Sequence, residues 1–411
     1  MYLIISKRFE MSLSFRYYRE DWPVAKNREA FGRQMGSKNG YGGNPVAYFV
    51  FHGPVDEKTG MLINVTIIKE RVNQLLAERY DHKYLNRDTA PFDKIIPTPE
   101  NIARQLFIDA APLFDNEPAR LAACHVATSP YDAATCYTGG RVERDYWLEF
   151  SAARRTCSPH LSDEENEILF GVASSKTGHG HFYRLRVTLQ GEPDADTGMI
   201  AKENDCRRVL ELLHIRLDHK NLNLEVPELR DLPMTTEYLA RFIFDQLRIS
   251  LPLARVRLWE NPYFYAEYLK GGRSLMGVKT GFRAAHRLHS SALSDEANCK
   301  LYGKCNNQAG HGHLYEVEGA IEGTLDERRG IFYGLDDFRD ALAEALEPWH
   351  LKHLDLDTDD FKNRPSTGEN IVRALWPRLE RTLQRQLYRL RLWETPNNRF
   401  TLRRGVEETE S

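Results

Sequence analysis

The sequence repeats one pattern three times, and this repetition limits what the chain can fold into. The copies of its best-kept mark are "YDHKYLN" (80–86), "LDHKNLN" (217–223) and the weaker "LKHLDLD" (351–357). A second mark, PT-x-E or a close variant, follows each copy, with Glu237 and Glu369 lying 132 residues apart. Marks that recur in one order at one spacing indicate tandem structural units. We expect three modules and a disordered tail: 1–139, 140–272, 273–403 and 404–411.

Each repeat shows the same order of expected elements. Two segments that alternate apolar and polar residues, FRAAHRL (282–288) and HLYEVEGAIEG (313–323), predict half-buried strands. RVNQLLAERY (71–80) and TTEYLARFIFDQL (235–247) have helical periodicity, and ARVRLWENP (254–262) predicts a closing strand. The fold class is therefore α+β, with an antiparallel four-stranded sheet and two helices on one face in each module.

Composition excludes several classes of protein. A net charge of −3 over 411 residues gives no broad basic surface for nucleic acid, so we expect no nucleic-acid partner. No apolar run approaches the roughly 20 residues that span a bilayer, and the start is too soon interrupted by charge to be a secretory signal. Six cysteines without a framework spacing suggest reduced thiols. We expect a cytoplasmic protein without a membrane partner.

The third module contains a candidate metal site. His311 and His313 are two residues apart, which places both imidazoles on one face of a strand. His286 lies in the first strand of the same module, and a hairpin brings it beside the pair. Three imidazoles with an open fourth position are typical of a catalytic Zn²⁺ site. The alternative is a hydrogen-bonded strand end beside a core histidine.

Cys305 lies six residues before His311, in the loop between the two strands. As a fourth ligand it would close the site, which is typical of a structural metal. As a free thiol near a cation it would act as a thiolate base or nucleophile. It could also be an inert small residue, and the sequence alone leaves all three interpretations open.

These motifs resemble one enzyme family. FxAAHRL, C-x5-HGH, LDHKNLN, PT-x-EN and a closing WET are similar to the 6-pyruvoyl-tetrahydropterin synthase and 6-carboxy-tetrahydropterin synthase family, of the tunnelling (T) fold. The resemblance implies that the three histidines bind zinc, that Cys305 is catalytic, and that Glu394 anchors the pterin. Glu260 of module 2 and Glu369 are further candidate pterin contacts. The family's Asp-His pair is assigned to Lys352 and His353, with His353 as a candidate catalytic residue.

The first two modules depart from the family pattern at the metal site. Module 2 has Arg154 in place of His286 and Ala173 in place of the cysteine, although it keeps His179 and His181. A fixed cation repels zinc, so we expect no metal there. The residues assigned to the site in module 1 are Phe15, Gln34, Gly40 and Gly42.

Modules 1 and 2 instead keep the intact pairs Asp81-His82 and Asp218-His219. An aspartate beside a histidine tunes its basicity and orientation. In the family this pair reaches the active site across a subunit interface. We therefore expect a composite site that borrows such a pair, with Asp218-His219 favoured. Three modules would form a pseudo-trimeric barrel, and two chains would form a homodimer that mimics the family's hexamer.

The resemblance predicts a zinc-dependent lyase that acts on 7,8-dihydroneopterin triphosphate and releases triphosphate to give 6-pyruvoyl-tetrahydropterin. Basic residues near the mouth are candidates to contact the triphosphate: Arg283, Arg287 and Lys304. One alternative is 6-carboxy-tetrahydropterin synthase, which feeds 7-deazaguanine (queuosine) synthesis. An alternative of another class is a non-catalytic pterin-binding or assembly protein.

Overall fold

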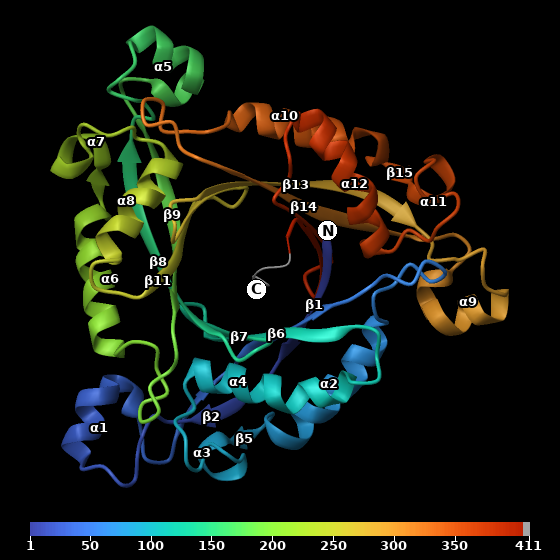
Figure 1. Cartoon of the computed structure of the whole chain (residues 1–411), viewed down its shortest axis with the longest axis horizontal. Coiled ribbons are helices and arrows are strands. Elements are labelled where there is room, and N and C mark those ends of the chain that lie inside the picture. Colours follow the sequence, from blue (N-terminus) through green and yellow to red (C-terminus); the bar gives the residue numbers. More distant parts are fainter. Residues whose placement is uncertain (406–411) are drawn as a thin grey trace.

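The computed structural model describes residues 1–405, and in each module helices pack outside a set of strands (Figure 1). Module 1 contains β1 (Tyr2–Glu10), β2 (Leu13–Phe15), α1 (Val24–Phe31), β3 (Tyr41–Gly43), β4 (Val46–His52), α2 (Val65–Arg79), β5 (Lys83–Tyr84), α3 (Leu85–Asp88), α4 (Pro99–Ala110), β6 (Arg120–Ser129) and β7 (Asp132–Tyr137). Module 2 contains β8 (Val142–Arg154), α5 (Asp163–Phe170), β9 (His179–Gln190), α6 (Glu203–Leu217), β10 (Lys220–Asn221), α7 (Leu222–Glu225), α8 (Thr236–Leu247), β11 (Leu253–Asn261) and β12 (Phe264–Leu269). Module 3 contains β13 (Ser274–His286), α9 (Asp295–Tyr302), β14 (His311–Gly323), α10 (Leu335–Leu346), β15 (Lys352–His353), α11 (Leu354–Asp357), α12 (Gly368–Leu383), β16 (Arg389–Thr395) and β17 (Asn398–Arg403).

The expected order of two strands, two helices and two strands is present in every module. The sequence did not predict the short helices α1, α5 and α9 in the loop between the first two strands. In modules 2 and 3 these helices begin at Ser162 and Ser294, whose side chains accept hydrogen bonds from backbone N–H groups in the first turn. This loop matters because its end carries Cys305.

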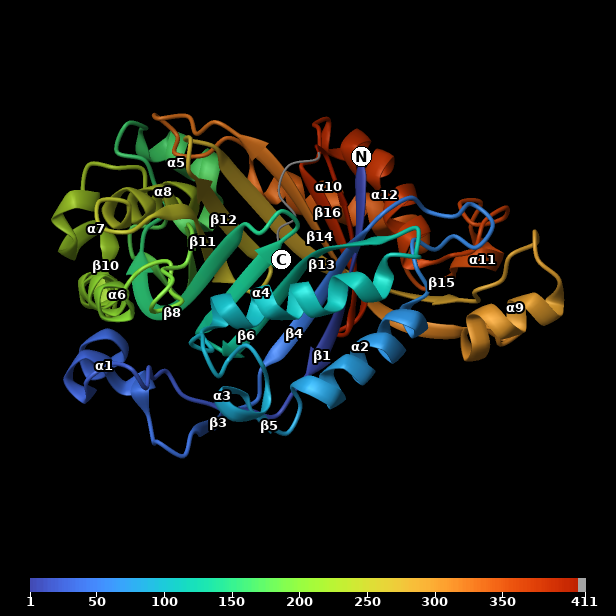
Figure 2. The same ribbon diagram turned by 60° about the horizontal axis from the view of Figure 1, so that its bottom comes forward.

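The long strands form one closed barrel. Twelve strands follow one another in the order β8-β7-β6-β4-β1-β17-β16-β14-β13-β12-β11-β9, and β8 pairs with β9 to close the ring. β1 pairs antiparallel with β17, from Tyr2 opposite Arg403 to Lys7 opposite Asn398, so the first module contacts the last. The pseudo-trimeric barrel expected for the tunnelling fold is confirmed, with the helices on its outer surface (Figures 1 and 2).

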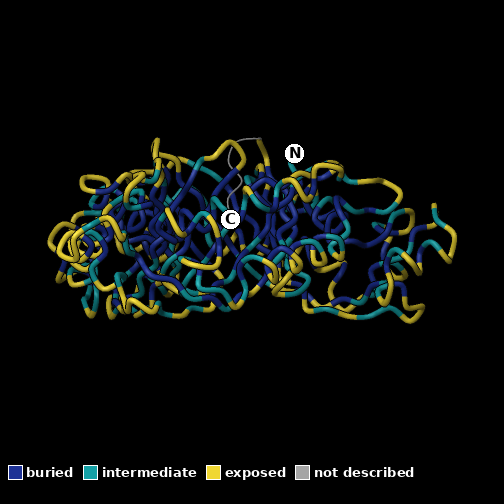
Figure 3. Tube along the Cα trace, turned by 90° about the horizontal axis from the view of Figure 1, so that it is seen from below, coloured by how far each residue is buried: buried dark blue, intermediate teal, exposed yellow. Residues whose placement is uncertain are grey.

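Apolar cores lie between the barrel strands and the helices. Along β11, Val256 and Leu258 are fully buried in such a core, while Arg255 and Arg257, which alternate with them, face the opposite side of the sheet. The trace coloured by burial shows buried residues throughout the middle of the molecule and exposed ones at its rim (Figure 3). Within residues 1–405, no helix has both the length and the apolar character needed to cross a membrane.

The repeated threonine of the PT-x-E mark joins each module to the next. Thr98, Thr235 and Thr367 cap α4, α8 and α12. Each hydroxyl also donates to a glycine carbonyl of the following module, at 2.6 to 2.7 Å. The glycine that meets Thr367 is Gly60, whose φ is +67° and where an added Cβ would lie 2.6 Å from Asn370 Nδ2. A residue without a side chain is therefore required in this turn.

The end of the chain is only partly described. Residues 406–411 of the predicted disordered tail lie outside the described residues. Arg404 is fixed, because its guanidinium donates to Glu380 and to the Leu387 carbonyl. The ordered part of the chain therefore extends past residue 403, where module 3 was expected to end.

Candidate active site

The three predicted metal ligands come together at one end of the β13–β14 hairpin. His286 is the last residue of β13 and stands opposite His311, and Ala284 stands opposite His313. One nitrogen of each imidazole lies within 4.8 Å of the others. His286 Nε2 and His311 Nε2 are 3.1 Å apart. Two nitrogens bound to one tetrahedral zinc at about 2.0–2.1 Å would lie about 3.3 Å apart, so the donor set fits Zn²⁺.

The protonation state of His286 also suits a cation. His286 is buried, and its Nδ1 donates to the Ser366 carbonyl over 3.1 Å, which directs the lone pair of Nε2 toward the other two rings. Burial lowers the pKa of His286 to about 4, so this imidazole is neutral at pH 7. Among the described residues, His313 Nε2 is buried without a hydrogen-bond partner. A metal ion would satisfy this orphaned nitrogen.

Cys305 lies outside the group of three histidines. It belongs to a 3₁₀ turn, Gly303–Asn306, that follows α9, and Leu288 N donates to its carbonyl over 2.9 Å. Because the ligand group consists of the three imidazoles, the described geometry favours an open fourth position over a closed structural site. Burial, followed by the charge of Glu394, raises the pKa of the Cys305 thiol. In the absence of a bound cation the thiol is therefore protonated at neutral pH.

Two carboxylates complete this end of module 3. Glu369 is buried in the first turn of α12 and accepts a hydrogen bond over 3.0 Å from Leu62 N of module 1. Burial raises the pKa of Glu369 to about 7, and the charge of Glu394 adds to the shift. Glu394 Oε1 lies 3.7 Å from His286 Nε2. Among the described residues no arginine or lysine forms an ion pair with Glu369. The site therefore spans the junction of the last and first modules.

At each of the other two junctions, an arginine engages the counterpart of one of these carboxylates. Arg144 contacts Glu100, the counterpart of Glu369 in module 1, at 3.4 Å. Arg154 stands opposite His179 as His286 stands opposite His311, which confirms that it replaces the first ligand. Its guanidinium donates to Glu260 over 2.5 Å. Glu260 is thus engaged within module 2.

The strand register corrects the predicted equivalences in module 1. Phe15 pairs with Tyr41, so Tyr41 and Gly43, rather than Gly40 and Gly42, take the places of the two histidines. The Tyr41 hydroxyl donates to Gln34, which does stand at the cysteine position. The sequence comparison was shifted by one residue because glycines stand at 40, 42 and 43, on both sides of Tyr41. Phe15, Gln34, Tyr41 and Gly43 offer no imidazole or thiolate ligand for a zinc ion.

The assignment of the Asp-His pair to Lys352 and His353 was wrong by two residues. His82, His219 and Leu351 share a positive φ of 55° to 59°, and the residue after each begins the short strand β5, β10 or β15. His350 and Leu351 therefore take the Asp-His place in module 3. The dipeptides His-Leu and Leu-Asp are repeated within residues 350–357, and this repetition shifted the sequence comparison. The 132-residue spacing between Glu237 and Glu369 gives the correct register.

His353 nevertheless lies next to the metal ligands. An added Cβ on Gly310, one residue before His311, would come within 2.6 Å of His353 Nε2. Nδ1 of His353 is 3.8 Å from Asp355, whose carboxylate accepts a hydrogen bond from Ser366 Oγ. A hollow beside the hairpin is lined by residues that include Arg283, Ala285, His313, Lys352 and His353.

The intact Asp-His pairs do not reach this site within one chain. His82 Nδ1 is 2.9 Å from Asp81, and His219 Nδ1 is 2.6 Å from Asp218. Each aspartate also accepts a backbone N–H of its own module, from Ser12 or Ser151. Both imidazoles are more than 80% exposed. β5, β10 and β15 lie at three separate places around the ring (Figures 1 and 2).

Comparisons with known proteins agree with the three modules. The family model described as 6-pyruvoyl tetrahydropterin synthase matches residues 5–138, 147–271 and 276–405. A 6-pyruvoyl tetrahydrobiopterin synthase of Homo sapiens is 41% identical over 133 residues, which are 31% of this chain and 92% of the human protein. The Drosophila melanogaster protein of the same name is 38% identical over 30% of this chain and 74% of its own length. The solved Caenorhabditis elegans synthase is 35% identical, covers 32% of this chain and 96% of its own, and has a TM-score of 0.32. The chain belongs to the 6-pyruvoyl tetrahydropterin synthase family.

Proposed function

We propose that the chain is a zinc-dependent lyase that converts 7,8-dihydroneopterin triphosphate to 6-pyruvoyl-tetrahydropterin. One observation carries the proposal: among the residues that the structure describes, a three-histidine group is found only at the junction of modules 3 and 1, with Glu394 3.7 Å from His286 and with Glu369 accepting a hydrogen bond from module 1. At the other junctions, Arg144 and Arg154 engage the carboxylates Glu100 and Glu260. The names of the similar proteins support this activity.

The residues of the junction have distinct roles in this proposal. Glu369 and Glu394 accept hydrogen bonds from the amino and ring N–H groups of the pterin, a pairing that suits carboxylates. His286, His311 and His313 hold zinc, which when bound acts as a Lewis acid on the oxygens of the substrate side chain. Cys305 accepts the proton from the adjacent carbon as triphosphate leaves.

The proton relay comes from a second copy of the chain. Module 3 has His350 and Leu351 at the relay position, while the histidines of the intact pairs are exposed. The apolar side chains Phe182, Leu314 and Leu351 are also more than 60% exposed, and two of them directly follow the second histidine of an HGH. A homodimer that stacks on this end would cover them and bring His82 or His219 to the partner's site. His353 is the candidate relay within module 3.

The product identifies the reaction. Zinc-loaded protein is incubated with 7,8-dihydroneopterin triphosphate, and pterins and free triphosphate are measured by mass spectrometry. We expect triphosphate and the mass of 6-pyruvoyl-tetrahydropterin in equal amounts. The mass of 6-carboxy-tetrahydropterin would establish the alternative enzyme, and pterin binding without any turnover would establish the binding protein.

All six cysteines are free in the structure, which supports a cytoplasmic location.

A further inference from the structure

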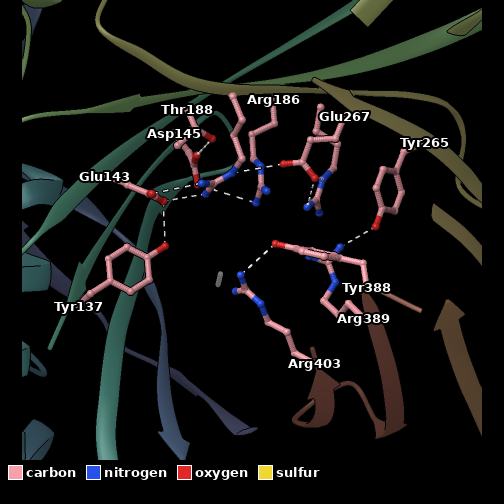
Figure 4. Close-up of polar contacts among 12 residues, drawn as sticks. Tyr137, Glu143, Asp145, Arg186, Thr188, Tyr265, Glu267, Tyr388, Arg389 and Arg403 are labelled. Carbon is pink, nitrogen blue, oxygen red and sulfur yellow. Dashed lines mark hydrogen bonds and ion pairs between the residues drawn. The ribbon is translucent and has the colours of Figure 1, made fainter. Parts of the chain in front are cut away.

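The inner face of the barrel is lined with arginine side chains. They alternate along the strands with the residues of the apolar cores, so they point to the opposite side from the helices. The set consists of Arg186 on β9, Arg255 and Arg257 on β11, Arg389 and Arg391 on β16, and Arg399 and Arg403 on β17. Figure 4 shows Arg186 and Arg403 extending toward each other from opposite walls. A barrel of twelve strands is wider than the eight-stranded barrels whose interiors side chains fill.

The carboxylates of the inner face are fewer than the arginines, and all four are already engaged. Among the described residues, the buried charged groups of this face are six of the arginines above with Glu143, Asp145, Glu267 and Glu318, and the seventh arginine, Arg399, is partly buried. Glu143 binds Arg255 at 2.7 Å, and Glu267 binds Arg257 at 2.5 Å. Glu318 is shared between Arg389 and Arg391, and Asp145 accepts from Thr188 at 2.5 Å. The lumen thus carries an excess of positive charge.

Several guanidinium nitrogens in the lumen have no partner among the described residues. These buried atoms are Nε and Nη2 of Arg186, Nε and Nη2 of Arg391, and Nε of Arg399. Arg186 and Arg391 are only 5% and 3% exposed, and the nearest carboxylate to Arg186 is Asp145 at 3.9 Å. Burial and the neighbouring arginines lower the pKa of Arg186 and Arg391. Buried donors and facing like charges are costly unless an anion satisfies both.

We propose that the barrel lumen is a binding site for a multivalent oxyanion of the phosphate class, held by Arg186, Arg391 and Arg399. Guanidinium groups present paired N–H donors that match phosphate oxygens, which a monovalent halide cannot satisfy in the same way. Arg186 belongs to module 2, while Arg391 and Arg399 belong to module 3. Arg399 also donates to Ser6 of module 1 over 3.1 Å. A bound phosphate would therefore link all three modules and stabilise the closed ring. This inference does not depend on the proposed lyase activity.

The binding is tested on the full chain, purified without multivalent anions, by isothermal titration calorimetry with inorganic phosphate and with tripolyphosphate. Sodium chloride at matched ionic strength is the control for screening. Binding of either phosphate, together with a rise in the melting temperature that chloride does not produce, is the expected result. We expect an Arg186→Gln/Arg391→Gln variant to bind at least about tenfold more weakly. Arg339→Gln, on the outer surface of α10, is the matched control and should bind as the wild type does.

A second set of variants separates the lumen from the candidate active site, whose mouth is also basic. Arg283→Gln/Lys304→Gln should leave the phosphate-induced rise in melting temperature in place. Loss of the rise in that variant, with retention in Arg186→Gln/Arg391→Gln, would overturn the proposal. If the lumen variant does not fold, a crystal structure of the wild type with tungstate decides: anomalous density between Arg186 and Arg391 supports the site, and its absence overturns it.

Discussion

The backbone N–H of Leu62 donates to the Glu369 carboxylate over 3.0 Å, so the first module completes a pocket that the last module begins. The same junction joins Thr367 to the Gly60 carbonyl and Tyr302 to the Thr59 carbonyl. Closing the ring is therefore a requirement for the site as well as for the barrel. A chain that consisted of module 3 alone would contain every metal ligand, but it would lack this hydrogen bond because Leu62 belongs to module 1.

We expect one zinc ion per chain by elemental analysis of the purified protein. His311→Ala should lose the metal, because two imidazoles of the group cannot hold zinc as three do. His179→Ala is the matched control in module 2 and should keep one zinc. A stoichiometry near two, or zinc retained in His311→Ala, would contradict the single metal site.

Elemental analysis can also test whether a substitution creates a second metal site. Arg154 stands opposite His179 in the register that His286 and His311 share in module 3. We expect Arg154→His to raise the zinc content toward two per chain, because it completes a second group of three imidazoles. An unchanged content in a folded variant would show that the β8–β9 hairpin does not reproduce the metal site.

Cys305→Ala should lower turnover by about 10²–10⁴-fold and leave zinc bound. The reason is that the thiol lies outside the histidine group, so the metal does not depend on it. Cys299→Ala removes an exposed thiol six residues earlier and should leave the rate unchanged. Loss of zinc together with activity in Cys305→Ala would make the cysteine a metal ligand.

Glu369 should make stability depend on pH in ligand-free protein. Its folded pKa is raised from 4.5 to about 7, so its contribution is fully present below pH 4.5 and is lost as pH rises through 7. At pH 8 the ionised carboxylate costs up to about 3 kcal/mol of unfolding free energy. Urea unfolding at pH 5 and pH 8 should show a smaller loss of stability for Glu369→Gln than for wild type.

Glu237→Gln is the control for this effect, since burial raises the pKa of Glu237 to about 7 as well. It should change the pH dependence of stability similarly but leave turnover intact, whereas Glu369→Gln should abolish it. An identical pH dependence for wild type and Glu369→Gln would show that this carboxyl titrates normally.

Mixing two inactive variants tests whether the relay crosses between chains. A Cys305→Ala chain keeps its Asp-His pairs, and a His82→Ala/His219→Ala chain keeps its cysteine. After dissociation and reassociation, half of the dimers are mixed and contain one intact site, so about a quarter of the wild-type activity should return. Full activity of the double histidine variant alone, with loss in His353→Ala, would assign the relay to module 3.

The sequence predicted the repeated module, the three histidines and the position of Cys305, because strand periodicity and short loops fix these locally. It did not predict that Leu62 meets Glu369, since that contact joins residues 307 positions apart through ring closure. It also misplaced the Asp-His position of module 3 by two residues. The prediction matched residue types, whereas the backbone φ and the strand register define this position. The engagement of Glu260 by Arg154 depends on packing between strands that only the structure gives.

We propose that triplication leaves a single open pterin site, at the junction of modules 3 and 1. The number of sites is measured most directly by isothermal titration calorimetry of zinc-loaded protein with 7,8-dihydroneopterin, which lacks the triphosphate leaving group. We expect one pterin per chain, lost in Glu369→Gln and retained in Glu237→Gln. Two or three pterins per chain, or one that is lost in Glu237→Gln and retained in Glu369→Gln, would contradict it.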